Sequence, residues 1–291
     1  MMRLKPFSRN SANPARLLVS LILLAFLFGC SSEIKPTYKE KDIPFHIKKI
    51  CKEEYGLDVT TSVVGQTLWV YAPMPRIIDK DYAITKEKVF DEAMTDKMRN
   101  IMTSIGRVLI SSDRAPEFYS LVISDIEERG LDYIIIANVL DIKKSYASVL
   151  PWTEMNKRYV VKLKSAPEAL GDTLGIHVIP YDIGLPEFIS GQIAQRIDSR
   201  LREPDFKNFY DVKAAEAQFT PTTLVINIDI KLQELRLKAP ETNDITKEAL
   251  KIAAQVTRAY DFEDFIEVQI NEGKEGKSTT FSRKVLETIR E

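Results

Sequence analysis

Residues 222–235 read TTLVINIDIKLQEL, and this stretch decides the fold class. Branched apolar residues occupy every second position from Leu224 to Ile230, which is the period of a strand that buries one face. The segment from about Ile245 to Tyr260 has the apolar spacing of a helix, and Phe265 to Ile270 is again β-rich. The order predicts a strand, a helix and a second strand.

The same order of signals occurs earlier in the chain. A β-rich run, an Ile-Thr-Lys-Glu sequence suited to the first turn of a helix, and a second apolar run follow one another in both halves. We interpret this order as either a duplicated β-α-β unit or a chance identity of four residues, since the first run and the helix start lie 17 residues apart in one half and 22 in the other. The matching segments are Thr67–Val70, Ile84–Glu87 and Phe118–Ile123, and then Thr223–Ile226, Ile245–Glu248 and Phe265–Ile270.

Further elements of the first half follow from periodicity and from turn residues. The short runs near Phe118 and Tyr133 fit strand or helix, and we favour a strand for the former and a helix for the latter. The long helix has Thr85 as its amino-terminal cap and an apolar stripe that includes Phe90. The expected elements are a helix over Ile43–Tyr55 capped by Gly56, a hairpin turning at Gly65 and closed by Pro73 and Pro75, the long helix to about Val108, a strand over Glu117–Asp125, a helix over Tyr133–Tyr146 and a strand over Tyr159–Leu163.

We interpret residues 164–175, which contain Pro167, Gly171 and Gly175, as a linker and the boundary before the second half. Strands and helices mix without strict alternation, so the sequence predicts an α+β fold of two mixed α/β domains, 43–165 and 170–291. The remaining elements are a short strand over Ile176–Tyr181, a helix from Pro186 to Leu201 stopped by Pro204, a turn at Gly273 and Gly276, and a short terminal helix.

The amino terminus has the pattern of an export signal. Arg3, Lys5, Arg9 and Arg16 precede a 12-residue apolar run, Leu17–Phe28, and the first acidic residue is Glu33. A run of this length is shorter than the ~20 residues that a membrane-spanning helix needs. A secretory signal peptide is therefore favoured over an uncleaved anchor.

The end of this run resembles the lipobox of bacterial lipoproteins. The residues that carry the resemblance are Leu27, Phe28, Gly29 and Cys30, and Phe28 is larger than the residue that usually stands at its position. The resemblance implies diacylglycerol on the Cys30 sulfur, cleavage before Cys30 and acylation of the new amino terminus. The alternative is an ordinary signal, but no Ala-x-Ala site lies nearby. Residues 1–29 are then the signal peptide, and 30–42 a lipidated tether.

The resemblance also implies a cellular location. Several acyl chains hold a protein stably on a bilayer, so we expect the cell envelope, with the membrane contacted through lipid on Cys30. Ser31 and Ser32 follow Cys30 without an Asp, which by analogy with Gram-negative lipoproteins favours the outer membrane, facing the periplasm, if the source organism has one. Residues 31–291 carry no motif by which we recognise a family.

Composition narrows the possible partners of the exported chain. Removing a leader with four basic residues and no acidic residue leaves 262 residues and changes the formal net charge from −1 to −5. This charge disfavours nucleic acid as a partner and also electrostatic binding to anionic lipid. Cys51 is the lone thiol left after lipidation, and its neighbours Phe45, Ile47 and Leu57 predict burial rather than a disulfide.

A search for catalytic motifs assigns no catalytic, cofactor-binding or metal-binding residue. His46 and His177 are the only histidines, neither has a second His or Cys at ligand spacing, and no G-x-S-x-G sequence marks a nucleophile. Gly276-Lys277-Ser278 looks like the end of a phosphate-binding loop, but Asn271 stands where the first Gly is needed. We interpret it as a solvated turn.

Aromatic residues offer the remaining candidates. Trp69 and Tyr71 share one strand face, which fills a core more often than it forms a binding platform. Trp152 lies in a polar stretch and is either an exposed interface anchor or packed against Arg158. Paired acids such as Glu127-Glu128 are interpreted as solvated surface.

The sequence therefore predicts an envelope-anchored lipoprotein with a non-catalytic binding or scaffolding role and an envelope protein as partner. Two alternatives remain. A hydrolase using carboxylates alone would show a cleft with two carboxyl groups about 5–10 Å apart. A carrier of an apolar ligand would show a large apolar cavity.

Overall fold

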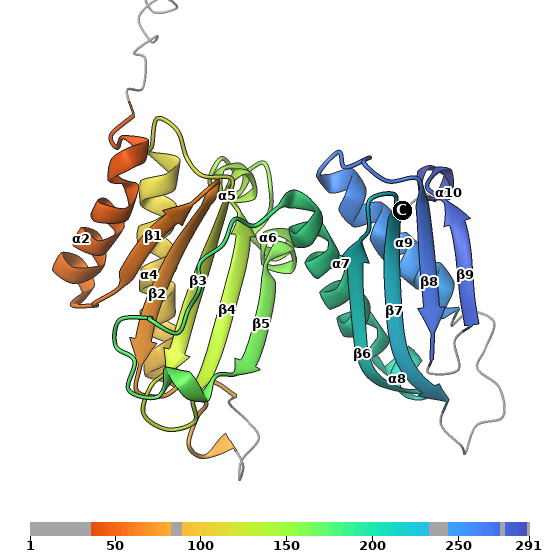
Figure 1. Ribbon diagram of the computed structural model, residues 1–291, viewed down its shortest axis with the longest axis horizontal. Coiled ribbons are helices and arrows are strands. Elements are labelled where there is room, and N and C mark those ends of the chain that lie inside the picture. The colour runs from red at the N-terminus through yellow and green to blue at the C-terminus, as the bar shows by residue number, and fades with distance from the viewer. Residues whose placement is uncertain (1–35, 83–88, 233–243, 274–276, 290–291) are drawn as a thin grey trace, which may run out of the picture. The chain divides into compact units, whose positions relative to one another are not determined.

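The computed structural model describes residues 36–82, 89–232, 244–273 and 277–289. Residues Tyr38–Glu291 form one compact unit, and the α+β class predicted from the sequence is confirmed by two mixed sheets (Figure 1). The strands are β1 (Thr60–Val64), β2 (Thr67–Met74), β3 (Phe118–Asp125), β4 (Leu131–Asn138), β5 (Val160–Ser165), β6 (Tyr210–Phe219), β7 (Thr223–Leu232), β8 (Glu267–Glu272) and β9 (Lys277–Ser282). The helices are α2 (Ile43–Tyr55), α4 (Glu92–Ile110), α5 (Val139–Tyr146), α6 (Trp152–Arg158), α7 (Leu185–Leu201), α8 (Pro204–Lys207), α9 (Ile245–Ala259) and α10 (Lys284–Thr288), with 3-10 turns η1 (Glu40–Asp42) and η2 (Pro167–Ala169).

The first sheet has the order β1-β2-β3-β4-β5. Strands β2 and β3 are parallel, whereas the other neighbours are antiparallel. Because two parallel strands cannot be joined by a tight turn, the chain returns through α4 before β3 begins. Strands β1 and β2 form the predicted hairpin, and Gly65 at the turn has a φ of 56°, a conformation that glycine adopts without a steric penalty.

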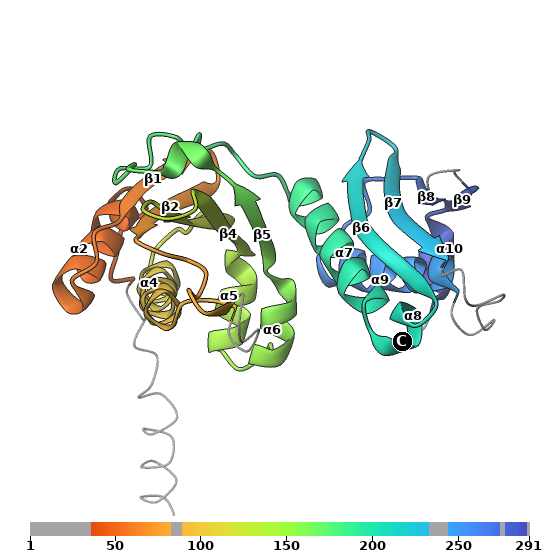
Figure 2. The same cartoon turned by 90° about the horizontal axis from the view of Figure 1, so that it is seen from below.

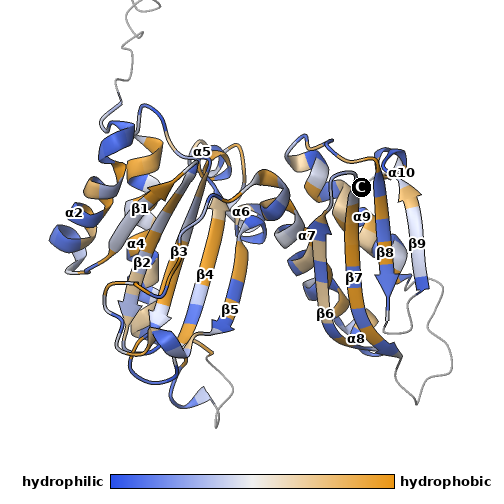
Figure 3. Ribbon diagram, in the orientation of Figure 1, coloured by the Kyte–Doolittle hydropathy of each residue, from blue (hydrophilic) through white to orange (hydrophobic). Residues whose placement is uncertain are grey.

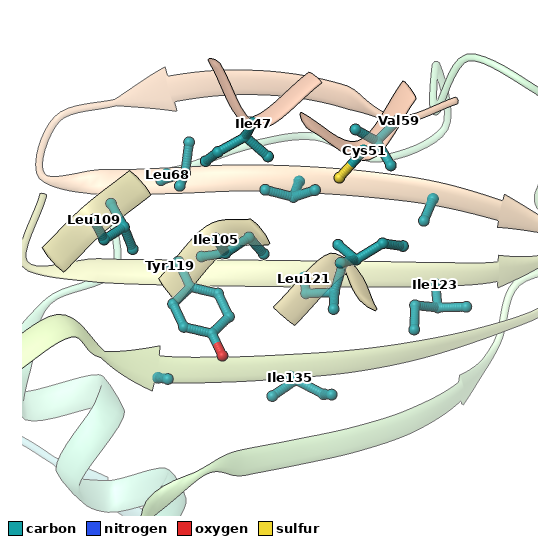
Figure 4. Packing of buried hydrophobic residues seen from close by; sticks show 14 of the residues in the cluster. Ile47, Cys51, Val59, Leu68, Ile105, Leu109, Tyr119, Leu121, Ile123 and Ile135 are labelled. Carbon is teal, nitrogen blue, oxygen red and sulfur yellow. The ribbon is translucent and has the colours of Figure 1, made fainter. Parts of the chain in front are cut away.

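Helices α2 and α4 cover one face of this sheet (Figures 1 and 2). Apolar side chains of the two helices and of the sheet pack against one another in one buried layer (Figure 4). The residues labelled there are Ile47, Cys51, Val59, Leu68, Ile105, Leu109, Tyr119, Leu121, Ile123 and Ile135, all of them buried.

The second sheet repeats the same order of elements. Strand order β6-β7-β8-β9 again has a central parallel pair, β7 and β8, joined through a helix, α9. A helix also precedes each hairpin, α2 before β1 and α7 before β6. The two segments that the sequence suggested as a repeated β-α-β unit therefore have the same strand order.

The central strand of the second sheet shows the alternation predicted from its sequence. Leu224, Ile226 and Ile228 are buried against α7 and α9, while Val225 and Asn227 on the other face are partly exposed. The banded colouring of β7 and β8 shows this alternation (Figure 3). The second sheet buries one face, as the period of two requires.

Several local predictions are wrong. The predicted helix over Tyr133–Tyr146 is strand β4 followed by α5, because Asn138 ends the strand and its Oδ1 accepts the Leu140 backbone N–H at the helix start. No strand forms over Ile176–Tyr181. Neither β6 nor β9 was predicted from the sequence.

The long helix also begins later than predicted. Its cap is Asp91, whose Oδ1 accepts the Met94 backbone N–H, and Phe90 lies before the helix in a bridge to Ile78. The predicted start, Ile84–Glu87 with Thr85, lies outside the described residues. The matching start in the second half is confirmed, since α9 begins at Ile245.

The compact unit begins inside the segment that the sequence assigned to the tether. Tyr38 donates its backbone N–H to Ser111 at 3.1 Å and accepts the Asp113 N–H at 3.0 Å, so it is paired with the loop that follows α4. The 3-10 turn Glu40–Asp42 then leads directly into α2. Residues 38–42 are thus folded.

We predict that Cys51 is inert in the native protein. The side chain is fully buried, and burial raises the pKa of the thiol, which disfavours the reactive thiolate. A polar maleimide should label native Cys51 only at the rate at which the protein unfolds. Val63→Cys, at an exposed site on β1, provides a fast-labelling comparison in a Cys51→Ser background. Rapid labelling of wild-type Cys51, or a dimer that dissociates on reduction, would contradict the prediction.

Candidate functional site

Residues 170–183, which we call the strap, cross the face of the first sheet opposite α2 and α4 (Figure 2). The strap has no regular secondary structure, yet it packs on Trp69 and Tyr71 of β2. Trp69 Nε1 donates a hydrogen bond to the Tyr181 carbonyl at 2.8 Å, and the Tyr71 hydroxyl donates to the Asp172 carbonyl. The two aromatic residues are therefore core, as the sequence analysis favoured.

Gly175 permits this close approach. Its φ is 77°, and a Cβ built there would lie 2.6 Å from the Tyr71 ring, a distance that real contacts do not reach. Only glycine satisfies both the backbone conformation and the space above the ring. The sequence had marked Gly175 as part of a linker, whereas the structure places it in contact with the first sheet.

A buried histidine clamps the strap to the sheet. His177 Nδ1 lies 2.6 Å from Asp172 Oδ2, and its Nε2 lies 3.1 Å from Asp132 Oδ1 at the start of β4. The imidazole is 5% exposed and Asp132 is 1% exposed. Ser124 of β3 also donates to Asp132, and Lys164 Nζ lies 3.6 Å from the second oxygen of that carboxylate.

Asp172 organises the chain around this histidine. One carboxylate oxygen accepts the backbone N–H groups of Leu174 and Gly175, and the other accepts that of His177 at 2.9 Å. Although burial acts in the opposite direction, these donors lower the pKa of Asp172 to about 2. Burial likewise tends to lower the pKa of His177, but the hydrogen bonds to Asp172 and Asp132 outweigh it and the pKa is raised.

This geometry fixes the strap and does not activate a nucleophile. Both ring nitrogens of His177 face carboxylate oxygens, so the protonated ring donates one N–H to Asp172 and the other to Asp132. A general base needs a free nitrogen within reach of the proton that it removes. Ser124 donates to Asp132 and not to His177, so these residues form no nucleophile–base pair.

The strap exposes large apolar side chains on its outer side. Ile176 and Ile179 are 80% and 83% exposed, and Leu170 and Leu174 are also exposed. We call these four residues the strap surface. Because the clamp holds the backbone in one conformation, a partner that bound here would not have to order the segment first.

Other parts of the described structure bear on the two alternative functions. The cavity beneath the strap is about 40 Å³, room for little more than a water molecule. A groove of about 740 Å³ between α6, α7 and α9 is lined by charged side chains. Its carboxylates Glu154, Glu203 and Glu248 each pair with an arginine.

The remaining candidates from the sequence do not gather at one site. Within the described residues no group of three or more His, Cys, Asp or Glu is arranged to hold a metal ion. His46 contacts the rings of Tyr38 and Phe45. Glu128 pairs with Arg76, Lys277 begins β9, and Cys30 lies outside the described residues.

Sequence reasoning missed the clamp because its members are far apart along the chain. Asp132 precedes His177 by 45 residues, and the periods used to find helices and strands do not bring them together. The local signal was Asp172 between Gly171 and Gly175, close before a histidine. An Asp in a Gly-rich turn is well suited to accept backbone N–H groups.

No protein-family model, no curated protein and no solved structure matches this chain. In the part of the chain that the structure describes, no helix is both long and apolar enough to cross a membrane.

We predict that His177→Gln destabilises the protein in a pH-dependent way. The raised pKa of His177 means that its ion pairs contribute stability fully below its ordinary pKa, and that this contribution is lost as the pH rises through the raised value. The lowered pKa of Asp172 means that its contribution holds above its ordinary pKa and is lost as the pH falls towards about 2. In urea unfolding between about pH 5 and pH 6, the free energy of unfolding of His177→Gln should be roughly 3 kcal/mol lower than that of the wild type, since breaking a buried pair leaves uncompensated charge.

The loss caused by His177→Gln should shrink as the pH rises above the raised pKa. His46→Gln provides the matched control, since His46 contacts two aromatic rings and its substitution should leave the clamp intact. A difference between wild type and His177→Gln that stays constant from pH 5 to pH 9 would argue against an imidazolium clamp.

Proposed function

We propose that this chain is an envelope-anchored lipoprotein with a non-catalytic scaffolding role, and that it binds an envelope protein through the strap surface. The observation that supports the proposal is a rigidly held segment whose outward side chains are large and apolar. The surfaces of soluble proteins normally carry single exposed apolar residues. Four within ten residues, on a segment fixed by buried ion pairs, indicate a contact surface.

The chemistry of the strap surface suits a protein partner. Apolar anchors in a preorganised segment give most of the affinity of an interface when a partner's pocket removes them from water. Complete burial of Ile176 and Ile179 would contribute roughly 2 kcal/mol each. Asp172 and His177 of the strap are already satisfied internally, so neither is left unpaired when a partner removes water from this surface.

At the strap, the geometry gives less support to the two alternatives. The carboxylates of the clamp are hydrogen-bonded to backbone N–H groups, to Ser124 and to an imidazolium, which leaves neither as a free acid or base. The small cavity beneath the strap does not hold a lipid chain or a similar apolar ligand. Binding through an exposed surface requires neither a free acid or base nor a large cavity.

We predict that the mature protein begins at an acylated Cys30. The resemblance of Leu27–Cys30 to a lipobox motivates this expectation. Mass spectrometry of the amino-terminal peptide should find the lipid-modified cysteine, and Cys30→Ser should leave an unprocessed precursor or a released protein. Cys51→Ser is the matched control and should be processed normally. An intact leader or an unmodified terminus at another residue would exclude the lipoprotein assignment.

We predict that a photo-crosslinking amino acid at Ile176 or Ile179 captures one discrete envelope protein in intact cells. The same group at Asp58, an exposed residue beyond α2, should give no discrete adduct. A double substitution, Ile176→Ser with Ile179→Ser, should abolish co-purification of that protein and change the free energy of unfolding by less than about 0.5 kcal/mol, because both side chains are exposed. An adduct with twice the mass of this chain would show self-association instead of scaffolding.

A further inference from the structure

A second exposed apolar surface lies at the turn between α5 and α6. Val149 is 72% exposed and Trp152 is 52% exposed, and Leu140 and Tyr146 of α5 are also exposed. We call these four residues the turn surface. They come from two short helices and from the loop that joins them, and they are separate from the strap surface, which follows β5.

The turn is held in one conformation. The Lys144 carbonyl accepts the backbone N–H groups of Val149 and Leu150 at 2.8 and 3.1 Å, which closes the end of α5. Ser148 adopts a φ of 58°, a left-handed conformation that directs the chain sharply outward. The Leu150 side chain is buried in the core beside α5, and this anchors the turn while Val149 stays in solvent.

Two aromatic rings frame the turn surface. Tyr146 and Trp152 meet edge to face with ring centroids 5.4 Å apart. Arg158 does not pack on Trp152 as one interpretation of the sequence had it, because it pairs with the buried Asp141 at 2.8 Å. Trp152 thus remains available for contact with another molecule.

The charges around the turn surface favour a lipid headgroup region. The acids nearby are used in ion pairs, Asp141 with Arg158 and Glu154 with Arg196. Lys143 and Lys144 in the last turn of α5 are partly exposed. Trp and Tyr next to apolar side chains and lysines is the composition found where proteins meet the bilayer interface.

Helix α5 begins at the end of the first sheet from which β3 starts (Figure 1). Tyr38 pairs with Ser111 and Asp113 in the loop that leads from α4 to β3. At the end of that loop the Glu117 carbonyl accepts the Val139 backbone N–H, the first residue of α5, at 2.8 Å. The start of the compact unit and the start of α5 are therefore joined through one loop.

The length of the preceding chain limits the distance to the membrane. From Cys30 to Tyr38 the chain advances eight residues, which span at most about 28 Å when fully extended. If Cys30 carries the lipid, the end of the sheet that holds Tyr38 cannot move farther than this from the bilayer. Helix α5, which begins at that end and carries part of the turn surface, then faces a high local concentration of lipid.

We propose that the turn surface inserts into the interfacial region of the bilayer to which Cys30 is anchored, with Trp152 at the depth of the headgroups. The inference rests on the lipid anchor of the proposed function. Insertion fixes the orientation of the folded unit on the membrane, which a single lipid anchor alone does not do. The contact is apolar, so it agrees with a net charge that disfavours binding by electrostatic attraction.

The test uses Trp152 as its own probe, because the chain has only two tryptophans and Trp69 is 7% exposed beneath the strap. Full-length lipidated protein is reconstituted in vesicles of phosphatidylethanolamine and phosphatidylglycerol, with or without phospholipid brominated near the headgroup. We expect bromolipid to quench the Trp152 component of the fluorescence at least twofold. Trp152→Phe, which retains Trp69, is the matched control and should show no quenching.

A second variant tests the inserted surface directly. Val149→Asp should keep the protein on the vesicles through its lipid and should abolish quenching of Trp152, because a carboxylate at this position opposes insertion. An exposed site tolerates the change without unfolding.

The outcomes separate the two proposals. If the protein does not float with the vesicles, the lipid anchor is absent and the proposed function fails. If it floats but Trp152 is not quenched in pure lipid, the turn surface does not insert and this inference is overturned, as it would be if the surface served a protein partner.

Discussion

The parallel pairing of β2 with β3 is the constraint on which the rest of the first sheet depends. These two central strands are buried along nearly their whole length on both faces. A parallel pair requires a crossover, and α4 supplies the cover for one face as it crosses. The other face carries Trp69, Tyr71 and Phe118, which must also leave water, and the strap together with Phe188 of α7 provides that cover.

An irregular segment packed on a sheet must satisfy its own backbone polar groups, since it has no ladder of hydrogen bonds. Asp172 does this for three backbone N–H groups, and His177 together with Lys164 offsets the charge that Asp172 and Asp132 bring to this place. The internal polar network and the outward apolar residues both follow from the packing of the strap on the sheet. The side chains of Asp172 and His177 are used to hold the strap on the sheet, while Ile176 and Ile179 are its most exposed apolar side chains.

The second sheet shows what the same order of elements does without a strap. Strand β7 packs Leu224, Ile226 and Ile228 against the helices. Its other face remains partly exposed, and there the Asn271 side chain donates a hydrogen bond to Asn227. A strand buried on one face alternates, whereas one buried on both faces reads as a continuous apolar run. This difference explains why β7 was predicted from its period. Strand β4 was mistaken for a helix because α5 follows it directly, so that apolar residues keep a helical spacing across the junction from Ile135 through Val139 to Tyr146.

Local chemistry in the sequence determined α2 with its Gly56 cap, the hairpin at Gly65, and the starts of α7 and α9, because each depends on residues within a few positions of one another. The α+β class followed from the same local signals. Only the tertiary structure decided that Asp132 would meet His177, because 45 residues separate them and the packing of the strap on the sheet brings them together. It also decided that Ile176 and Ile179 would lie in solvent: an apolar side chain carries the same tendency to be buried wherever it stands, and the fixed path of the strap leaves no room for these two inside.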